Sequence, residues 1–226
     1  MPISTRDLSS MPEIEALRRY LQSAAMLEAI LVSGSGFDML PDHRFDSRWV
    51  KGEQLAMWDN GQGDNFFCVF TEDGCWIKGF DHEAMMTPYR VRPPSIWKDM
   101  FKGMPTCFKK LVNEPAFECD HTTTFCIWRR AGAKAWSRGD FELPKHRDPD
   151  GSAWILELLD RTPDDWTEFE NDNFELGVSI NGGTVTAIFE HQPLTLHAIR
   201  QIDIRANIEA CQAAAGKIGY PTKINS

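Results

Sequence analysis

The sequence has no apolar run long enough to cross a bilayer as a helix, which takes about 20 residues. Its N-terminus has no basic stretch followed by an apolar core, so we expect neither a signal peptide nor membrane attachment. The six cysteines mostly stand in apolar surroundings, as reduced core cysteines do. These features predict a cytoplasmic protein.

The common catalytic and metal-binding motifs are also missing. The chain contains no Gly-x-Ser-x-Gly, Ser-x-x-Lys, His-Glu-x-x-His or Cys-x-x-Cys pattern, and its cysteine spacing fits no zinc site. The Ser33-Gly34-Ser35-Gly36 segment follows a predicted helix and lacks the lysine of a phosphate-binding loop. We therefore expect no cofactor. The absences weigh against an enzyme without deciding the question.

Basic residues are in short supply. Lysine and arginine number 24 against 33 aspartates and glutamates, so the formal net charge is −9. Non-specific binding to nucleic acid needs a basic surface, so we expect no nucleic-acid partner. An acidic surface suits a basic protein partner, or serves only for solubility.

The chain is organised around a predicted hairpin between Trp58 and Glu83. Every position from Phe66 to Phe70 is apolar, which indicates a strand buried on both faces. Asp73-Gly74 predicts a two-residue turn, and Cys75–Phe80 predicts the returning strand. We expect this hairpin in the middle of a sheet.

Periodicity and capping residues predict the remaining elements. Further strands are expected at 43–50, 53–58 and 122–130, with a last hairpin formed by 174–180 and 185–190. Helices are expected at about 13–31, 96–101, 106–112, 153–159, from 163 onward, at 196–201 and at 204–215, the last capped by Asp203 and stopped by Gly216.

These elements predict one α+β domain over residues 1–226, with 1–12 as a loose lead-in. Its sheet is mostly antiparallel, built from hairpins and packed with N-terminal and C-terminal helices. Phe67-Cys68-Val69-Phe70 and Phe125-Cys126-Ile127-Trp128 each precede a turn and a Trp-x-basic-Gly sequence. The two segments are either a degenerate repeat or two hairpins that follow the same packing rules.

The first candidate site lies at the open end of the central hairpin: Asp59, Asp64, Asp81, His82 and Glu83. Antiparallel pairing would bring the loop before Phe66 next to the residues after Phe80. Three interpretations stay open. The group could contact a partner, hold a hard cation or act in acid–base chemistry through Asp64, Asp81, His82 and Glu83, or only cap its own loops.

The second candidate site is the acidic segment 160–175, which carries seven acids and one arginine. Asp164, Asp165 and Glu168, with Trp166 as an aromatic anchor, could receive a basic partner. The alternative is the solvated face of an amphipathic helix.

Two family resemblances are visible. Asn60-Gly61-Gln62-Gly63-Asp64 followed by Gly79-Phe80-Asp81-His82-Glu83 resembles a signature of the SUKH superfamily. That resemblance implies an α+β immunity protein or regulator that binds a protein partner. The motif comes early in this chain, and the long C-terminal half has no clear counterpart.

The whole chain also resembles a family of bacterial single-domain proteins. The resemblance rests on short segments such as Phe45-Asp46-Ser47-Arg48-Trp49, Asp120-His121-Thr122-Thr123 and Ile218-Gly219-Tyr220-Pro221. It implies one intact domain and no particular function.

The leading hypothesis is a non-catalytic protein-binding module of bacterial type, immunity-like, with a basic partner. The alternative is a metal-binding protein or hydrolase that uses the carboxylates and histidine at the edge of the central hairpin.

Overall fold

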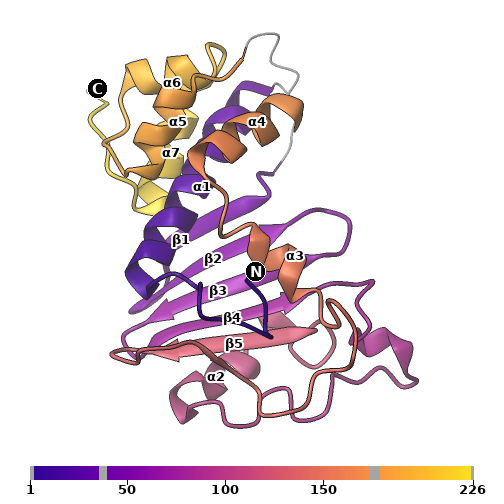
Figure 1. Cartoon of the computed structure of the whole chain (residues 1–226). Helices are drawn as coiled ribbons and strands as arrows, with labels where there is room; N and C mark the ends of the chain where they lie inside the picture. Colours follow the sequence, from indigo (N-terminus) through magenta and orange to yellow (C-terminus); the bar gives the residue numbers. More distant parts are fainter. Residues whose placement is uncertain (1–2, 36–39, 174–178, 225–226) are drawn as a thin grey trace. The chain divides into compact units, whose positions relative to one another are not determined.

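The computed structural model describes residues 3–35, 40–173 and 179–224, and it has the α+β fold predicted from the sequence (Figure 1). The strands follow the order β1-β2-β3-β4-β5-β6 in one sheet. Their bounds are β1 His43–Val50, β2 Glu53–Asp59, β3 Asn65–Thr71, β4 Gly74–Phe80, β5 Phe125–Arg130 and β6 Ser137–Arg138. The pairs from β2 to β6 are all antiparallel, which confirms a sheet built largely from hairpins.

One long helix lies in the N-terminal part of the chain, a short one lies near its middle, and the others follow in its second half. They are α1 Ile14–Ser35, α2 Lys109–Val112, α3 Ser152–Glu157, α4 Pro163–Asn173, α5 Gly182–Phe189, α6 Leu196–Ile202 and α7 Ile208–Ile218. Short 3₁₀ turns occur at Pro88–Arg90, Thr106–Phe108 and Pro115–Phe117. In the described parts of the chain, no helix is both long and apolar enough to cross a membrane.

The chain groups into two compact units. The first comprises residues 1–14 and 50–160, and the second comprises 15–49 and 161–226. The single domain over 1–226 therefore stays a prediction. The lead-in, expected to be loose, is held within the first unit: Thr5 bonds to Asp150 and Ser152, and Trp136 Nε1 donates to Pro12 O at 2.9 Å.

The central hairpin confirms the expected position of strands β3 and β4 inside the sheet. Every residue of β4 is buried, because β3 and β5 flank it on both edges. The turn differs from the prediction. Thr71 pairs with Gly74, so the loop residues are Glu72 and Asp73 rather than Asp73 and Gly74. Gly74 begins β4 with φ +138°, where a Cβ would lie 2.1 Å from Arg129 O.

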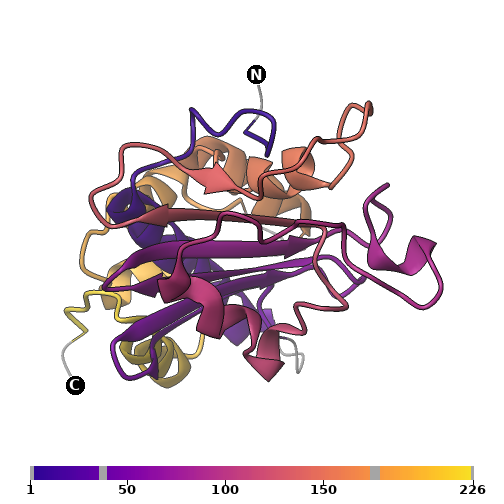
Figure 2. The same ribbon diagram turned by 90° about the horizontal axis from the view of Figure 1, so that it is seen from below.

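In the first unit, the two faces of the sheet are covered by different segments. On one face, Trp154 of α3 packs against Trp58, which pairs with Phe66 across β2 and β3. On the other face, the Phe117 ring packs on Phe67 and Trp76. Figures 1 and 2 show α3 and the segment around α2 on these opposite faces.

The predicted strand 185–190 is wrong. Residues Gly182–Phe189 form helix α5, and the Asn181 side chain caps it by accepting a hydrogen bond from Thr184 N at 2.9 Å. Most of the predicted partner strand, 174–178, lies outside the described residues. The β-branched and aromatic composition of the segment favoured a strand, but the cap and the burial of Val185 and Ile188 override that weak preference.

Two predicted helices also need correction. Residues 96–101 form no helix, and 98–101 form a turn, because Asp99 has φ +63°, which an α-helix does not accommodate. The helix expected at 204–215 is α7, which begins after the cap Asn207 and ends at Gly219 rather than Gly216. Asp203 instead binds Arg205 with both carboxylate oxygens.

Candidate functional site

The loop between β2 and β3 is held by side chains that bond to its own backbone. Asn60 Oδ1 accepts hydrogen bonds from Gln62 N at 2.8 Å and Asp64 N at 3.1 Å. Asp59 Oδ1 accepts one from Gly61 N at 2.9 Å. These are Asx turns, in which a short polar side chain replaces a backbone acceptor. Asp59 therefore shapes this loop, as the structural alternative proposed.

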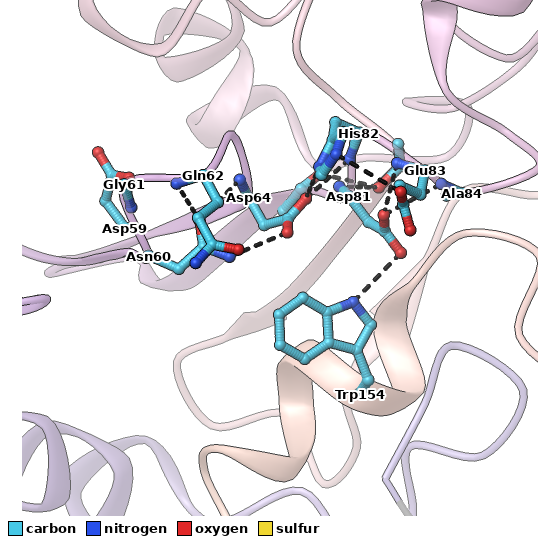
Figure 3. Close-up of polar contacts among 12 residues, drawn as sticks. Asp59, Asn60, Gly61, Gln62, Asp64, Asp81, His82, Glu83, Ala84 and Trp154 are labelled. Atoms are coloured by element: carbon cyan, nitrogen blue, oxygen red, sulfur yellow. Dashed lines mark hydrogen bonds and ion pairs between the residues drawn. The ribbon is translucent and has the colours of Figure 1, made fainter. Parts of the chain in front are cut away.

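The pairing of β3 with β4 places Asp64 beside His82, as the sequence predicted. Asp64 Oδ1 accepts hydrogen bonds from His82 N at 2.8 Å and from the ring Nδ1 at 2.7 Å. Asp64 Oδ2 accepts one from Asn60 Nδ2 at 3.0 Å, and the residue is only 6% exposed. The carboxylate thus ties the glycine loop to the end of β4 (Figure 3).

Asp81 organises the turn that follows β4. Its Oδ1 accepts hydrogen bonds from Glu83 N at 2.8 Å and Ala84 N at 3.0 Å. Its Oδ2 accepts one from Trp154 Nε1 at 3.2 Å (Figure 3). Gly151 lies so close that a Cβ there would be 2.3 Å from the Asp81 Cβ. The start of helix α3 can therefore lie this close to Asp81 only because residue 151 is a glycine.

His82 and Glu83 present their side chains to solvent. The His82 side chain is about half exposed and the Glu83 side chain is 84% exposed. His82 Nε2 lies 3.9 Å from Glu83 Oε1, at the limit of an ion pair. In this cluster, Glu83 is the carboxylate available for contact with another molecule.

The electrostatics of the pair favour the charged forms of both groups. Burial raises the pKa of Asp64, but hydrogen bonds from His82 and Asn60 outweigh it and hold that pKa below its ordinary value. The hydrogen bond to Asp64, and then the charge of that carboxylate, raise the pKa of His82. Near neutral pH, Asp64 is ionised and His82 is more readily protonated than a free histidine.

The metal-binding alternative has partial geometric support. One ligand atom each from Asp64, Asp81 and His82 lies within 4.8 Å of the others, and Glu83 is not part of this group. Calcium and magnesium take about six or more ligands, mostly oxygens, at roughly 2.0–2.6 Å. All four carboxylate oxygens of Asp64 and Asp81 accept hydrogen bonds within the chain, and the two Oδ2 atoms, with one bond each, keep a lone pair that a cation could use.

Exposed apolar side chains lie in the segment that follows this cluster. Tyr89 is 57% exposed and its ring packs edge-on against Phe80 at 6.1 Å. Met85 is 46% exposed, and Trp154 is partly exposed although it bonds to Asp81. The exposed carboxylate of Glu83 is thus followed in the chain by exposed methionine and tyrosine side chains, and the neighbouring Asp81 holds a partly exposed tryptophan. These residue types are enriched in protein interfaces.

The second predicted site lies on α4, in the other unit. Asp164, Asp165 and Glu168 are exposed, and Asp165 also caps the helix by accepting from Thr162 N and Oγ1 at 2.8 and 2.7 Å. Trp166 needs correction as a surface anchor. It is 0% exposed, because its indole packs into the core of the unit and offers no surface to a partner.

Sequence reasoning missed Trp154 and Gly151 at the first site. Both come from a segment about 70 residues away, since Trp154 and Asp81 are 73 positions apart. No local pattern links them. The Asn60-Gly61 pair is visible in the sequence and is typical of turns. The two hydrogen bonds that the Asn60 side chain accepts from the loop backbone were not predicted.

Comparison with known proteins adds no relative. No family model, curated protein or solved structure matches this chain.

Proposed function

We propose that this protein is a non-catalytic, cytoplasmic protein-binding module of the bacterial immunity type, with a basic protein as its partner. One observation carries the proposal. At the end of the central hairpin, an exposed carboxylate and exposed Tyr, Met and Trp side chains stand near Asp64 and Asp81, whose carboxylates are hydrogen-bonded within the chain.

The hydrogen bonds of these two carboxylates are suited to holding a surface in shape. The oxygens of Asp64 and Asp81 accept hydrogen bonds from their own loops and from Trp154, which holds both carboxylates and the surrounding backbone in place. Two glycines with positive φ, Gly61 and Gly63, form the adjacent turn. Such pre-organised loops reduce the entropic cost of binding.

The chemistry of the surface indicates the partner. The Glu83 side chain is 84% exposed, so a cation can reach its carboxylate, and the same segment exposes the apolar surface of Met85 and Tyr89. The chain carries a net charge of −9, which attracts a basic protein over long range and repels nucleic acid. The resemblance of residues 60–83 to the SUKH superfamily supports the same interpretation.

Affinity capture from the native host tests this proposal. Tagged wild type and the double variant Glu83→Lys/Tyr89→Ala are compared, with Glu72→Lys as the matched control. Glu72 is exposed in the turn at the opposite end of the same hairpin, and its substitution by lysine changes the net charge by the same amount as Glu83→Lys. We expect a basic protein that wild type and Glu72→Lys retain, that the double variant loses, and whose binding weakens with salt.

The opposite result is equally clear. If the double variant retains the same proteins as wild type, or if the specifically retained protein is not basic, the proposal is wrong. The acidic face of α4 is tested in parallel with Asp164→Lys/Asp165→Lys/Glu168→Lys, which shows whether the second predicted surface contributes.

The metal-binding alternative is favoured only by the spacing of Asp64, Asp81 and His82. Calorimetric titration with calcium, magnesium, manganese and zinc, each alone, decides it. Stoichiometric binding that Asp81→Asn abolishes would replace the binding-module proposal with a metal site. If none of the four ions gives heat or raises the unfolding temperature, the metal-binding alternative is wrong.

A further inference from the structure

A partly open pocket lies in the second unit, within residues 15–49 and 161–224. Its volume is about 330 Å³, at the lower end of the range of small-molecule sites. It is lined by Ala16, Arg19, Tyr20, Arg161, Pro163 and Phe189. Arg161 and Pro163 also belong to the acidic segment 160–175, but none of the lining residues is among the contact residues proposed for either candidate site.

The aromatic wall of the pocket is rigidly held. The Tyr20 and Phe189 rings lie 5.2 Å apart, and Phe189 packs on Trp166 at 5.7 Å. Tyr20 Oη accepts a hydrogen bond from Trp166 Nε1 at 2.7 Å and donates one to Arg161 O at 3.3 Å. A flat ring entering the pocket would therefore meet a surface that needs no rearrangement.

Arg161 places its positively charged guanidinium next to these aromatic rings. Its guanidinium lies 4.0 Å from the centre of the Phe169 ring and 5.4 Å from that of Trp166. Its Nη1 is buried and finds no hydrogen-bond acceptor among the described residues. A buried donor without an acceptor is unfavourable, and an oxyanion is the natural acceptor for a guanidinium.

The carboxylates nearest to Arg161 do not meet this need. Asp165 accepts both of its close hydrogen bonds from Thr162 at the start of α4. Glu170 is buried, and burial together with the charges of Glu28 and Asp42 raises its pKa to about 9. Glu170 is therefore uncharged near neutral pH. Within the described chain, Arg161 forms no ion pair with a carboxylate.

Arg19 is the second cation of the pocket. It is exposed, and its Nη2 donates to the main-chain oxygen of Glu190 at 3.2 Å. It too forms no ion pair with a carboxylate in the described parts of the chain. Acids outnumber bases by nine in this protein, so two such arginines at one small pocket indicate a site for an external anion.

We propose that this pocket binds a small aromatic carboxylate, with Arg19 and Arg161 contacting the carboxylate and Tyr20 and Phe189 packing against the ring. The planar guanidinium matches a carboxylate geometrically. The carboxylate is either that of a free small molecule or the C-terminal group of a peptide that ends in an aromatic residue. This site is independent of the surface around Glu83.

The test is titration of the full chain with phenylacetate and with N-acetyl-phenylalanine, followed by calorimetry and by NMR of the Trp166 indole N–H. Phenylacetamide, which keeps the ring and removes the charge, is the ligand control. Variant Arg19→Ala removes one anion contact, and Arg161→Lys replaces the planar guanidinium with an ammonium that keeps the charge. Arg48→Ala is the matched control, since Arg48 is an exposed arginine of the same unit outside the pocket.

We expect saturable binding of at least one carboxylate, with a shift of the Trp166 indole signal. Arg19→Ala should weaken binding about tenfold or more, as the loss of a charge-assisted contact does. Arg161→Lys should weaken binding less, because the charge stays and only the planar geometry is lost. Arg48→Ala should bind as wild type does. Preference for N-acetyl-phenylalanine would indicate a peptide terminus, and preference for phenylacetate a free small molecule.

Three results would overturn the proposal: no saturable binding of either carboxylate, equal affinity for phenylacetamide, or equal losses in Arg48→Ala and Arg19→Ala. Should Arg161→Lys fold poorly by circular dichroism, Arg19→Ala decides alone, because Arg19 is exposed. Capture of a basic partner through Glu83 is measured separately, so failure at one site leaves the other result intact.

Discussion

Asp64 and His82 are joined by two hydrogen bonds to the same carboxylate oxygen, one from the His82 main chain and one from its ring. This contact closes the open end of the central hairpin, since Asp64 precedes β3 and His82 follows β4. It also couples the glycine loop to the turn that carries Glu83. The properties of the candidate surface therefore depend on this pair.

The pair predicts a defined pH dependence. The pKa of His82 is raised, so its contribution to stability is complete below about pH 6.5 and is lost as the pH rises through the folded-state value. The pKa of Asp64 is lowered, so its contribution is complete above about pH 3.9 and is lost as the pH falls through its folded-state value. The pair should stabilise most between these limits.

An NMR titration of the His82 ring measures the effect directly. In Asp64→Asn, the pKa of His82 should fall back toward the ordinary histidine value, because the hydrogen bond to a charged acceptor is lost. Glu83→Gln is the control and should change it much less, since Glu83 lies 3.9 Å from Nε2 and is exposed to solvent. Equal effects of the two variants would contradict the assigned cause.

Buried Lys78 predicts an unusual rise of stability at alkaline pH. Lys78 is 0% exposed, and its Nζ donates to Phe117 O at 2.9 Å and Thr122 Oγ1 at 2.8 Å. Burial lowers its pKa from 10.5 to about 8. Between these values the unfolded chain binds more protons, so unfolding should become less favourable as the pH rises.

Urea unfolding of wild type and Lys78→Met at pH 8 and pH 10 measures how the Lys78 pKa shift changes the free energy of unfolding. The difference in the free energy of unfolding between the two proteins should change by up to about 3 kcal/mol from pH 8 to pH 10. This is the free energy of a shift of roughly two pKa units. Lys98→Met, at an exposed lysine of the same unit, should follow wild type. If the free energy of unfolding of Lys78→Met changes with pH as that of wild type does, Lys78 is not desolvated.

Gly151 should tolerate no side chain. At φ +74°, a Cβ would lie 2.3 Å from both Cβ and Oδ2 of Asp81. Gly61 has a similar φ of +68° and open space around it. We expect Gly61→Ala to lower the free energy of unfolding by about 1 kcal/mol through backbone strain alone, and Gly151→Ala by about 3 kcal/mol through strain and overpacking.

Chemical denaturation of both alanine variants separates the two effects. Because the backbone conformations match, any excess loss in Gly151→Ala comes from the contact with Asp81. Equal losses would mean that α3 moves away from Asp81 at little cost.

Glu170 predicts an opposite pH dependence in the second unit. Burial, Glu28 and Asp42 raise its pKa from 4.5 to about 9, so the folded chain retains a proton that the unfolded chain releases. Stability should therefore fall as the pH rises between these values. Glu170→Gln keeps the shape of the neutral carboxyl and should remove this fall, which makes the variant more stable than wild type at pH 8.

Thermal unfolding at pH 5 and pH 8 checks the prediction. Glu168→Gln, at an exposed position of the same helix, should keep the wild-type pH dependence. If Glu170→Gln also keeps it, Glu170 is ionised in the folded protein.

The central hairpin and the meeting of Asp64 with His82 were predictable because their causes are local. A fully apolar run, a turn with Gly74 and antiparallel pairing are enough to bring the ends of β3 and β4 together. Helix α5 was not predictable from the same rules. Its β-branched residues favour a strand weakly, and the packing of Val185 and Ile188 outweighs that preference.

By itself, the sequence determined the α+β class, the central β3–β4 hairpin and the neighbouring carboxylate and histidine, because alternation, turns and caps act over a few residues. Only the tertiary structure decided that Trp154 bonds to Asp81 and that Arg19 and Arg161 line one pocket. These relationships join segments distant in the chain, and packing rather than local preference selects them.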